Sequence, residues 1–362
     1  MKTLFKKIFN FTMLLNLFDA TIQPGGLYTD KGNVYNAISV EANDLTAEQR
    51  TFYHMELIEI NDANLVHDQF AMHREVPQGS GPIFSMRGFD PYAPATTPLQ
   101  EGITPANPNK MKPFQVMAEI KEYGCFTPHT DWLHMVAMDD VAQQDIKKLG
   151  IQAAQTKEIL IRDTLAAGKY VMYAPVEASN GTLTYVSDRS SLTAQNKFSV
   201  REILRAVAFL KNHNAQPFDG KEFICIIHPD VELDVLTSKG FTELVKYTAN
   251  VERVYNGEIG KIGMVRFVVT SMAKKWDGAG NAGTDVYSSL VLSEGAYVVA
   301  QYKGGGLQTF FKPVGSAGSA DPINQRGTNG WKFTLAVARV VEEYMIRVES
   351  GASANPYYTT SV

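Results

Sequence analysis

The chain has 362 residues, of which 44% are hydrophobic and 20% are charged, and its formal net charge is −4. This size and composition allow a sizeable buried core and predict two or more compact regions. No basic stripe stands out, so sequence-specific recognition of nucleic acid is not expected. The two cysteines, Cys125 and Cys225, lie far apart, which argues against a disulfide framework and suits a reducing compartment.

The first twenty residues combine lysines with an apolar run, and two interpretations are open. A signal peptide has such regions, but Asn10, Asn16 and Asp19 interrupt or bound the run, and no small-x-small cleavage site comes after it. We therefore favour an amphipathic arm that docks on a neighbouring molecule. The run is too short to span a bilayer and no later segment resembles a transmembrane helix, so we expect a soluble protein.

A change in texture near residue 66 separates this arm from the next region. Residues 44–65 have helical periodicity. Prolines and glycines then punctuate about fifty residues, within which residues 82–87 and 115–123 alternate as two long strands would. We predict a protruding, two-stranded loop. Because an isolated hairpin is barely stable, we expect it to lean on another molecule.

The longest periodic segment spans residues 139–168. Its apolar residues recur at spacings of three, four and seven, which places them in one stripe on a helix: Ala142, Ile146, Leu149, Ala153 and Leu160. Asp139 and Asp140 favour the helix start through its dipole, and Gly168 offers a left-handed stop. About 28 residues at about 1.5 Å each give a rod of about 42 Å. We interpret this rod as a spine to which other modules attach.

A mixture of helices and antiparallel strands after the spine predicts an α+β domain. Asn180-Gly181 signals a two-residue hairpin turn, and Ser199 with Glu202 forms a capping box before an amphipathic helix. The remaining expected elements are a strand at 223–227, a helix after His228-Pro229-Asp230, a helix at 241–248, strands at 264–270, 287–292 and 296–301, a Gly/Ser/Pro-rich segment at 304–330 and a terminal strand at 331–347.

Residues 278–283 match the glycine pattern GxGxxG. This pattern cradles a dinucleotide only when a strand directly precedes it and a helix directly succeeds it. Here Lys274, Lys275 and Trp276 intervene, and residues 284–292 have strand character. A surface loop is the favoured interpretation.

Two further clusters could carry chemistry. A metal site could be drawn from Cys125, His129, His134, Asp139 and Asp140, but a single thiol at this spacing fits no common structural zinc pattern. His228 comes after a strand, where a catalytic base could lie, but no nucleophile elbow or acid partner accompanies it. We favour a turn that caps a helix through Asp230. The residues therefore predict no catalytic group, cofactor or metal.

The order of arm, extended loop, spine helix, mixed domain and returning strand resembles the major capsid proteins of tailed double-stranded DNA phages, which have the Hong Kong ninety-seven fold. Several motifs resemble the family typified by the coat protein of phage N-four. They are residues 95–105 (ATTPLQEGITP), 123–131, 227–230 (IHPD), 256–263 (NGEIGKIG), and 312–313 together with 319–332 (SADPINQRGTNGWK), the last with Ile323 in place of leucine. The resemblance covers roughly residues 65–349, and the N-terminus matches no family motif.

The resemblance implies that copies assemble into pentamers and hexamers, and then into an icosahedral shell around phage DNA. The implied partners are further copies, portal, scaffold and decoration proteins, and non-specifically packaged double-stranded DNA, with no membrane. The implied location is the virion, after assembly in the host bacterial cytoplasm. On this layout the expected regions are an N-terminal arm at 1–65, an extended loop at 66–115, a peripheral domain at 116–176, an axial domain at 177–325, and a returning strand and tail at 326–362. The expected inter-subunit contacts are Arg87, Thr97, Glu101, Asp321, Asn324, Arg326 and Trp331.

Two other functions stay open: an encapsulin-like compartment that houses an enzyme, and a metal- or nucleotide-dependent enzyme. Some coat proteins of this fold form lysine–asparagine cross-links between subunits. Lys110 or Lys112 with Asn324 or Asn329 could supply one, but we favour solvated or acid-paired lysines.

Overall fold

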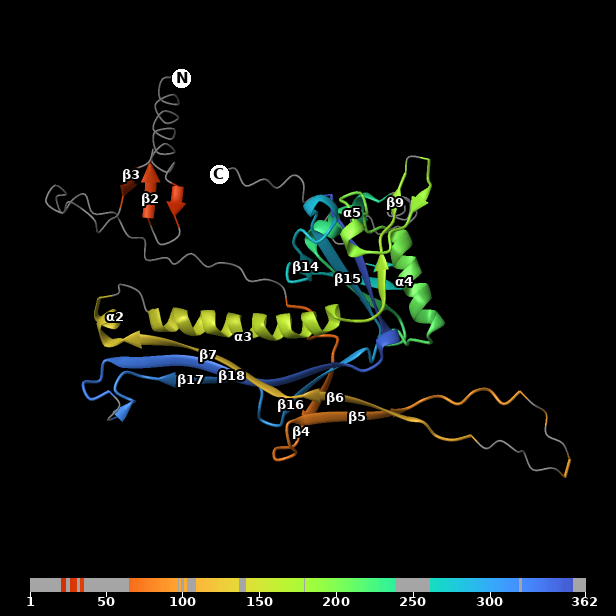
Figure 1. The fold of residues 1–362 in the computed structure, drawn as a ribbon. Helices are drawn as coiled ribbons and strands as arrows, with labels where there is room; N and C mark the ends of the chain where they lie inside the picture. The colour runs from red at the N-terminus through yellow and green to blue at the C-terminus, as the bar shows by residue number, and fades with distance from the viewer. Residues whose placement is uncertain are drawn as a thin grey trace, which may run out of the picture. The chain divides into compact units, whose positions relative to one another are not determined.

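The computed structural model describes residues 65–96, 98, 101–102, 109–136, 141–178, 180–238, 261–318 and 321–353, together with three short strands nearer the N-terminus (Figure 1). Met1–Ile60 and Asn61–Val362 form separate compact units. In the first, β1 (Thr21–Gln23), β2 (Leu27–Asp30) and β3 (Asn33–Tyr35) pair as an antiparallel sheet. The helices expected at 44–65 and 241–248 fall outside the described residues, apart from the last position of the first.

The second unit contains a five-stranded sheet whose longest strand is β18 (Arg326–Arg339). The first part of β18 pairs antiparallel with β7 (Lys121–Thr130) and with β17 (Gln308–Lys312). Its last residues pair with β16 (Tyr297–Tyr302), which pairs in parallel with β4 (Met72–Val76). We call this the long sheet.

The predicted spine is helix α3 (Val141–Ala166), which covers one face of the long sheet (Figure 1). Leu149 and Ala153 of the predicted stripe are buried, whereas Ile146 is 43% exposed. Toward the C-terminal end, Ile161 and Leu165 take over the buried positions. A straight helix has 3.6 residues per turn, so a stripe with a repeat of about 3.5 residues rotates gradually off one face.

The second sheet has the strand order β12-β13-β11-β15-β19-β8, with β14 also pairing with β15. Its strands are β8 (Val171–Tyr173), β11 (Phe223–Ile227), β12 (Lys261–Ile262), β13 (Val265–Val269), β14 (Lys275–Trp276), β15 (Val286–Leu292) and β19 (Met345–Ser350). Every residue of β11 and β15 is buried. Strands covered on both faces read as continuous apolar runs, as β11 does, whereas β15 also buries Ser288 and Ser289.

Two different layers cover the two faces of this second sheet. Phe223, Cys225 and Ile227 pack with α4 (Val200–Asn212) and α5 (Pro229–Thr237). The alternate residues Ile224 and Ile226 pack instead with side chains of α3 and the long sheet. The second sheet therefore joins the two halves of this unit through its core.

Arginines from the last two strands cap the C-terminal end of α3. Arg347 donates to the carbonyl oxygens of Ala166 and Gly168, and Arg339 donates to the Thr164 carbonyl at 2.6 Å. Cations near the last carbonyls of a helix are favourable because that end carries partial negative charge. These contacts fix the end of the spine to β18 and β19.

Two local predictions are right in outline and wrong in detail. β9 (Val176–Glu177) and β10 (Leu183–Thr184) pair as expected, but only Gly181 has a positive φ, of 79°. The Ala178 N–H bonds to the Thr182 carbonyl, so the loop has three residues and ends in a left-handed glycine. Before α4, the Ser199 hydroxyl donates to the Glu202 carboxylate instead of accepting a backbone N–H.

The terminal strand expected at 331–347 is wrong as one element. It is two strands, β18 and β19, which belong to different sheets and are separated by residues 340–344 with a short turn, η5 (Glu342–Tyr344). The Gly/Ser/Pro-rich segment at 304–330 also holds β17 and the start of β18. Apolar content continues across the corner, so composition alone does not mark it.

The sheets divide the chain at other points than the boundaries expected for its regions. β16 and β17, from the expected axial range 177–325, lie in the long sheet, whereas β19, from the range 326–362, lies in the second sheet. β4, at the start of the expected extended loop, is also part of the long sheet. The two strands that project are β5 (Ile83–Phe89) and β6 (Pro113–Glu119), which pair antiparallel as predicted. None of the described helices is long and apolar enough to cross a membrane.

Candidate assembly surfaces

The paired strands β5 and β6 form a ribbon whose two faces differ in chemistry. Residues directly opposite each other in an antiparallel pair point to the same face. The pairs Phe84–Ala118, Met86–Val116 and Gly88–Phe114 therefore give one wholly apolar face. The other face carries Ile83–Glu119, Ser85–Met117, Arg87–Gln115 and Phe89–Pro113, a mixture of polar and apolar pairs.

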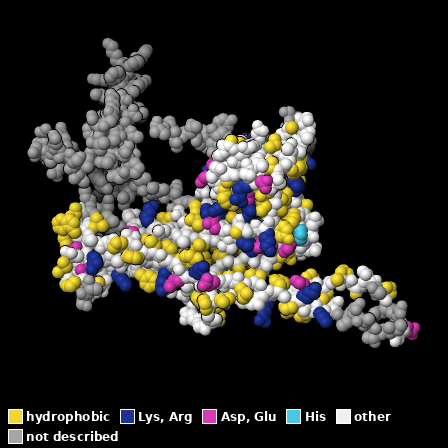
Figure 2. All heavy atoms as spheres, in the orientation of Figure 1, with side chains coloured by type: hydrophobic (Ala, Val, Ile, Leu, Met, Phe, Trp, Pro, Cys, Tyr) yellow, Lys and Arg dark blue, Asp and Glu magenta, His cyan; other side chains and the backbone are white. Residues whose placement is uncertain are grey.

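Only the base of this ribbon packs against its own subunit. Phe84 and Ala118 lie against a small core formed by Val76, Ile120, Ala300 and Ala336. The large apolar side chains that are more than half exposed lie on the mixed face or beyond the paired residues (Figure 2): Ile83, Phe89 and Met117, and Tyr92 and Met111. An isolated two-stranded ribbon is marginally stable, and contiguous exposed apolar area marks an interaction site.

Gly88 has a specific role in the ribbon. A Cβ atom at this position would lie 2.2 Å from the ring of Phe114. The ring therefore lies directly on the glycine backbone, and this contact covers a position that would otherwise have no side-chain packing.

A second exposed apolar surface lies where β7 leads into α2 (Asp131–Val136), beside β17. Its large apolar side chains are each more than half exposed: Trp132, Met135 and Val136 on α2, Phe311 on one face of the sheet and Phe126 on the other. None of them is among the contacts predicted from the sequence. The available signal was the density of large apolar side chains between residues 126 and 136, in a segment that begins as a strand.

The turn before β18 is organised by Asp321 from the inside. Asp321 is 4% exposed, and its carboxylate accepts the Arg326 N–H at 2.7 Å. Its carbonyl accepts the N–H of Asn324, which has a φ of 56°. Asparagine tolerates this left-handed conformation better than most residues. The polar residues of this motif thus fix a turn that delivers the chain into β18.

Trp331 is part of the core between β18 and α3. It is 4% exposed, stacks on Phe333 with 5.3 Å between ring centroids, and donates from Nε1 to Gln152 at 3.1 Å. Asn329, two residues earlier on the same face, is buried and donates its amide to Asp145 at 2.8 Å. These side chains attach the long sheet to the spine.

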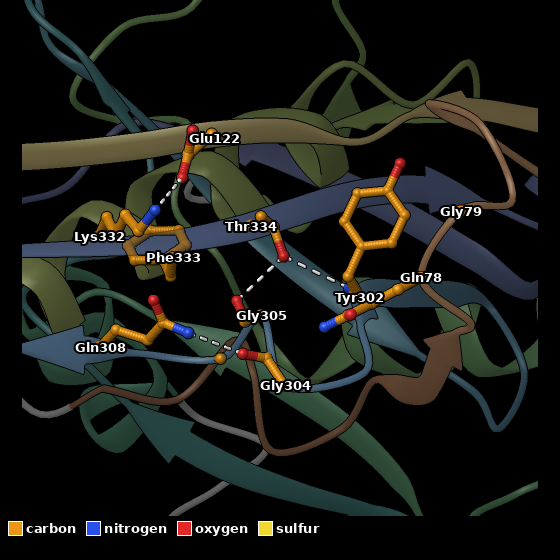
Figure 3. Close-up of a pocket in the computed structure, with 11 residues that line it drawn as sticks. Gln78, Gly79, Glu122, Tyr302, Gly304, Gly305, Gln308, Lys332, Phe333 and Thr334 are labelled. Atoms are coloured by element: carbon orange, nitrogen blue, oxygen red, sulfur yellow. Dashed lines mark hydrogen bonds and ion pairs between the residues drawn. The ribbon is translucent and has the colours of Figure 1, made fainter.

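A groove of about 280 Å³ lies between the turn at Gly304–Gly306, the turn at Gln78, and strands β7 and β18 (Figure 3). Lys332 and Glu122 form an ion pair of 3.0 Å at one side, and Thr334 accepts from the Tyr302 N–H and donates to the Gly305 carbonyl. The described lining contains no histidine, cysteine, serine or aspartate. Such a groove can accommodate a side chain or a peptide segment, but it offers no nucleophile–base pair.

The chain resembles known proteins in structure. No protein-family model matches the chain, and no curated protein does. The capsid of cyanophage P-SCSP1u superposes with a TM-score of 0.63 at 13% identity, over 92% of this chain and 98% of that one. The chain has the phage capsid fold. The capsid of Ralstonia phage GP4 gives 0.62 at 14% identity over 84% and 96% of the two chains, and that of Helicobacter pylori bacteriophage KHP30 gives 0.62 at 12% over 89% and 100%.

The α+β class and the Hong Kong ninety-seven architecture expected from the sequence are thereby confirmed. On this capsid fold, two of the expected contact residues need correction. Asp321 and Trp331 are buried within their own subunit, so they act on its folding and have little surface to offer a neighbour. Arg87, Glu101, Asn324 and Arg326 are exposed and stay predicted contacts, and Thr97 lies outside the described residues.

The exposed contact residues do not form one site within a subunit. Arg87 lies on β5 and Glu101 in the segment beyond it, whereas Asn324 and Arg326 lie at the turn into β18. Among the residues considered for a cross-link, Asn329 is only 1% exposed. Lys110, Lys112 and Asn324 are exposed.

The glycine pattern at 278–283 connects β14 to β15, two antiparallel neighbours. The Gly278 N–H donates to the Asp285 carboxylate at 2.7 Å, and the chain then enters a strand as predicted. A phosphate-binding loop of this kind would instead lead into a helix whose first amides face the phosphate. The surface-loop interpretation is therefore confirmed.

His228 itself is the N-cap of α5, which corrects the expectation that Asp230 supplies the cap. Its Nδ1 accepts the Asp230 N–H at 3.1 Å, and the Asp230 carboxylate accepts the Tyr287 hydroxyl at 2.7 Å. Burial lowers the pKa of His228, while the nearby Asp230 carboxylate acts in the opposite direction. A histidine held neutral as a helix cap accounts for this arrangement.

The metal site drawn from the sequence is described only in part. Cys125 and His129 lie on β7, and His129 stacks on Phe311 at 6.5 Å. In the described portion of the chain, no three His, Cys, Asp or Glu side chains are placed to hold a metal ion. The side chains of His134, Asp139 and Asp140 are outside that portion.

One buried charged pair attaches the segment before β4 to the spine. Glu158 accepts the N–H groups of Val66 and His67 at 2.7 and 2.9 Å, and the ring Nδ1 of His67 at 2.6 Å. Burial alone would raise the pKa of Glu158, but hydrogen bonding and charge attraction from His67 lower it below its ordinary value. Both side chains are almost fully buried, which makes this a structural clamp.

Proposed function

We propose that this chain is a structural major capsid protein, copies of which assemble into pentamers and hexamers and then into an icosahedral shell around phage double-stranded DNA. The observation that carries the proposal is the near end-to-end match to a capsid chain, over 92% of this chain and 98% of the other. A match that left a large part of either chain uncovered would allow an added domain with another activity.

The exposed surfaces support self-association. The ribbon carries large apolar side chains that are more than half exposed, and further exposed apolar side chains lie on α2. In a closed shell each copy meets several neighbours, so modest contacts reinforce one another through high effective concentration. The ribbon corresponds to the projecting part of the expected extended loop.

The finer partners and location belong to the same proposal. Portal, scaffold and decoration proteins would bind the assembled shell, which forms in the host bacterial cytoplasm and becomes the head of the virion. A net charge of −4 suits a container that holds DNA without gripping it, because each phosphate contact adds salt-dependent affinity.

No specific observation favours the alternatives. The three solved structures named above are phage capsids, which gives no support to an encapsulin-like compartment. His228 at its turn and Thr334 in the groove of Figure 3 form hydrogen bonds within the subunit.

The direct test is expression of the full chain, then density-gradient sedimentation and negative-stain microscopy. We expect closed shells, alone or with scaffold protein supplied. In a matched variant, an Asn-Gly turn replaces residues 88–114 and joins Arg87 to Gln115, which are directly opposite in the ribbon. This variant keeps the packed base and should fold with an unchanged melting curve but form no shells. Persistent monomers of the unaltered chain in the presence of scaffold would refute the proposal.

A further inference from the structure

The outer strip of α4 carries unbalanced charge around an exposed leucine. Ile203, Ala206, Val207 and Leu210 of this helix face the core, and its one acid, Glu202, is buried beneath the Ser199 hydroxyl. The strip that remains outside carries Arg201, Leu204, Arg205, Ala208 and Lys211, at spacings that place them on one face. It therefore presents three cations and no anion, with Leu204 56% exposed between them.

Within the described part of the chain, these cations form no ion pair with a carboxylate. Most other arginines of this unit that are partly buried have partners: Arg189 and Arg347 bind Glu349, and Arg339 binds Glu342. In contrast, no described carboxylate lies within ion-pair distance of Arg201, Arg205 or Lys211. Arg205 instead lies over the exposed ring of Tyr185 at 4.8 Å, which holds its guanidinium at the surface.

Helix α5 presents the opposite combination. Val231, Asp234 and Val235 face inward, and the outer strip carries Glu232 beside Leu233, which is 46% exposed. Glu232 also has no cationic partner among the described residues. Partial burial raises its pKa, so a cation placed nearby would stabilise its charged form. By contrast, Asp230 is already engaged with Tyr287 and Asp234 with Ser353.

We propose that the α4 strip of one copy docks on the α5 strip of the next copy, with Leu204 against Leu233 and Arg201 and Arg205 toward Glu232. This inference rests on the proposed self-assembly and assigns one of its interfaces. The two strips are different surfaces of the same chain, so the contact is head-to-tail, and such contacts close into rings when the rotation between copies allows it. The charge pair fixes orientation and rejects the like-on-like alternatives, α4 against α4 and α5 against α5.

The test is a charge swap. R201E/R205E and E232K are made separately and together, with R201Q/R205Q as a milder variant and K221E, an exposed cation that belongs to neither helix, as the matched control. Melting curves establish folding, and sedimentation with microscopy measures assembly. We expect each separate reversal to raise the protein concentration needed for assembly by about tenfold or more, the combined variant to recover it, and K221E to behave as the unaltered chain.

Several results would overturn the inference. If R201E/R205E assembled at the same protein concentration as the unaltered chain, the α4 strip would not be part of the interface. Normal assembly of E232K, with R201E/R205E defective and not rescued, would place the acidic partner elsewhere on the neighbour. Normal shells of R201E/R205E that retain less DNA would assign the strip to nucleic acid. If the unaltered chain itself formed no shells, the proposed function would fail first, and that outcome is distinguishable because it precedes any substitution.

Discussion

Trp331 and Phe126 lie on adjacent strands of the long sheet but point to opposite faces, and this makes them a matched pair. Trp331 is opposite Cys125, and Phe126 is opposite Gly330, one position away. The indole packs inward against α3, whereas the phenyl ring is 68% exposed. We predict that Trp331→Ala destabilises the isolated subunit, and that Phe126→Ala leaves subunit stability unchanged and weakens assembly.

The magnitudes come from burial. Truncation of a fully packed Trp or Phe to Ala costs about 3–5 kcal/mol, through lost transfer free energy and the cavity that remains. Trp331→Phe keeps an aromatic ring against Phe333 and loses the hydrogen bond to Gln152, so we expect a cost of about 1–2 kcal/mol. An exposed substitution such as Phe126→Ala falls within about 0.5 kcal/mol of zero.

Urea unfolding of the unassembled subunit measures its free energy of unfolding, and sedimentation of assembly reactions measures the extent of assembly. Trp331→Phe serves as an internal scale, since it should lie between the unaltered chain and Trp331→Ala. If Trp331→Ala unfolded at the unaltered urea concentration yet failed to assemble, Trp331 would be an inter-subunit contact after all. In that case the assignment of the indole to the subunit core would be wrong.

Three further predictions concern the spine, the groove and the buried clamp. Gly150→Ala should stabilise the subunit by about 0.5–1 kcal/mol because its Cβ meets no atom within 4 Å, whereas Gly150→Pro should destabilise it by about 3 kcal/mol or more. Equal thermal unfolding midpoints for the two variants would contradict a continuous helix at this position. Gly305→Ala places a Cβ 2.3 Å from the Thr334 hydroxyl and should destabilise the subunit by about 1–3 kcal/mol, whereas the Cβ of Gly306→Ala has its nearest atom at 4.0 Å and should leave stability almost unchanged. If urea unfolding showed Gly306→Ala to be the less stable variant, the packing at this turn would be refuted. Glu158→Gln should cost about 1–3 kcal/mol at neutral pH. Because the folded-state pKa of Glu158 is lowered, its carboxylate contributes fully to stability above its ordinary pKa of 4.5, and this contribution is lost as pH falls through the lower folded value. The difference in unfolding free energy between the unaltered chain and Glu158→Gln should therefore shrink below about pH 4.5. A difference that stays constant down to about pH 3 would show that the charge of Glu158 does not matter.

Sequence periodicity identified the elements that pack locally, and missed those that depend on distant partners. The spine, the two strands of the ribbon, α4 and β11 all lie close to their predicted positions, because each has a clear apolar pattern. The pairing of β4 with β16 and the corner between β18 and β19 could not be predicted in this way. The first depends on contact between segments more than a hundred residues apart, and the second depends on which of the two sheets each strand joins. Neither leaves a local pattern in the sequence.

The contact residues show the same limit. Asp321 and Trp331 stand in the motif at 319–332, for which the resemblance implied inter-subunit contacts. The structure instead uses Asp321 to fix a turn and Trp331 to pack the sheet against α3, both within one subunit. The exposed apolar residues around α2 could be identified only once the pairing of the sheet showed which side of β7 faces α3. The strip on α4 is readable from sequence in principle, since its cations recur with helical spacing, but the burial of Glu202 is not.

The position of the last two strands has a consequence for synthesis. β18 lies between β7 and β17 in one sheet, and β19 lies between β15 and β8 in the other, so both sheets receive an internal strand from residues 326–350. Until those residues leave the ribosome, neither sheet can close, however much of the chain has already been made. A prematurely terminated product therefore lacks a finished subunit body, and under the proposed function such a product would be unable to join a shell.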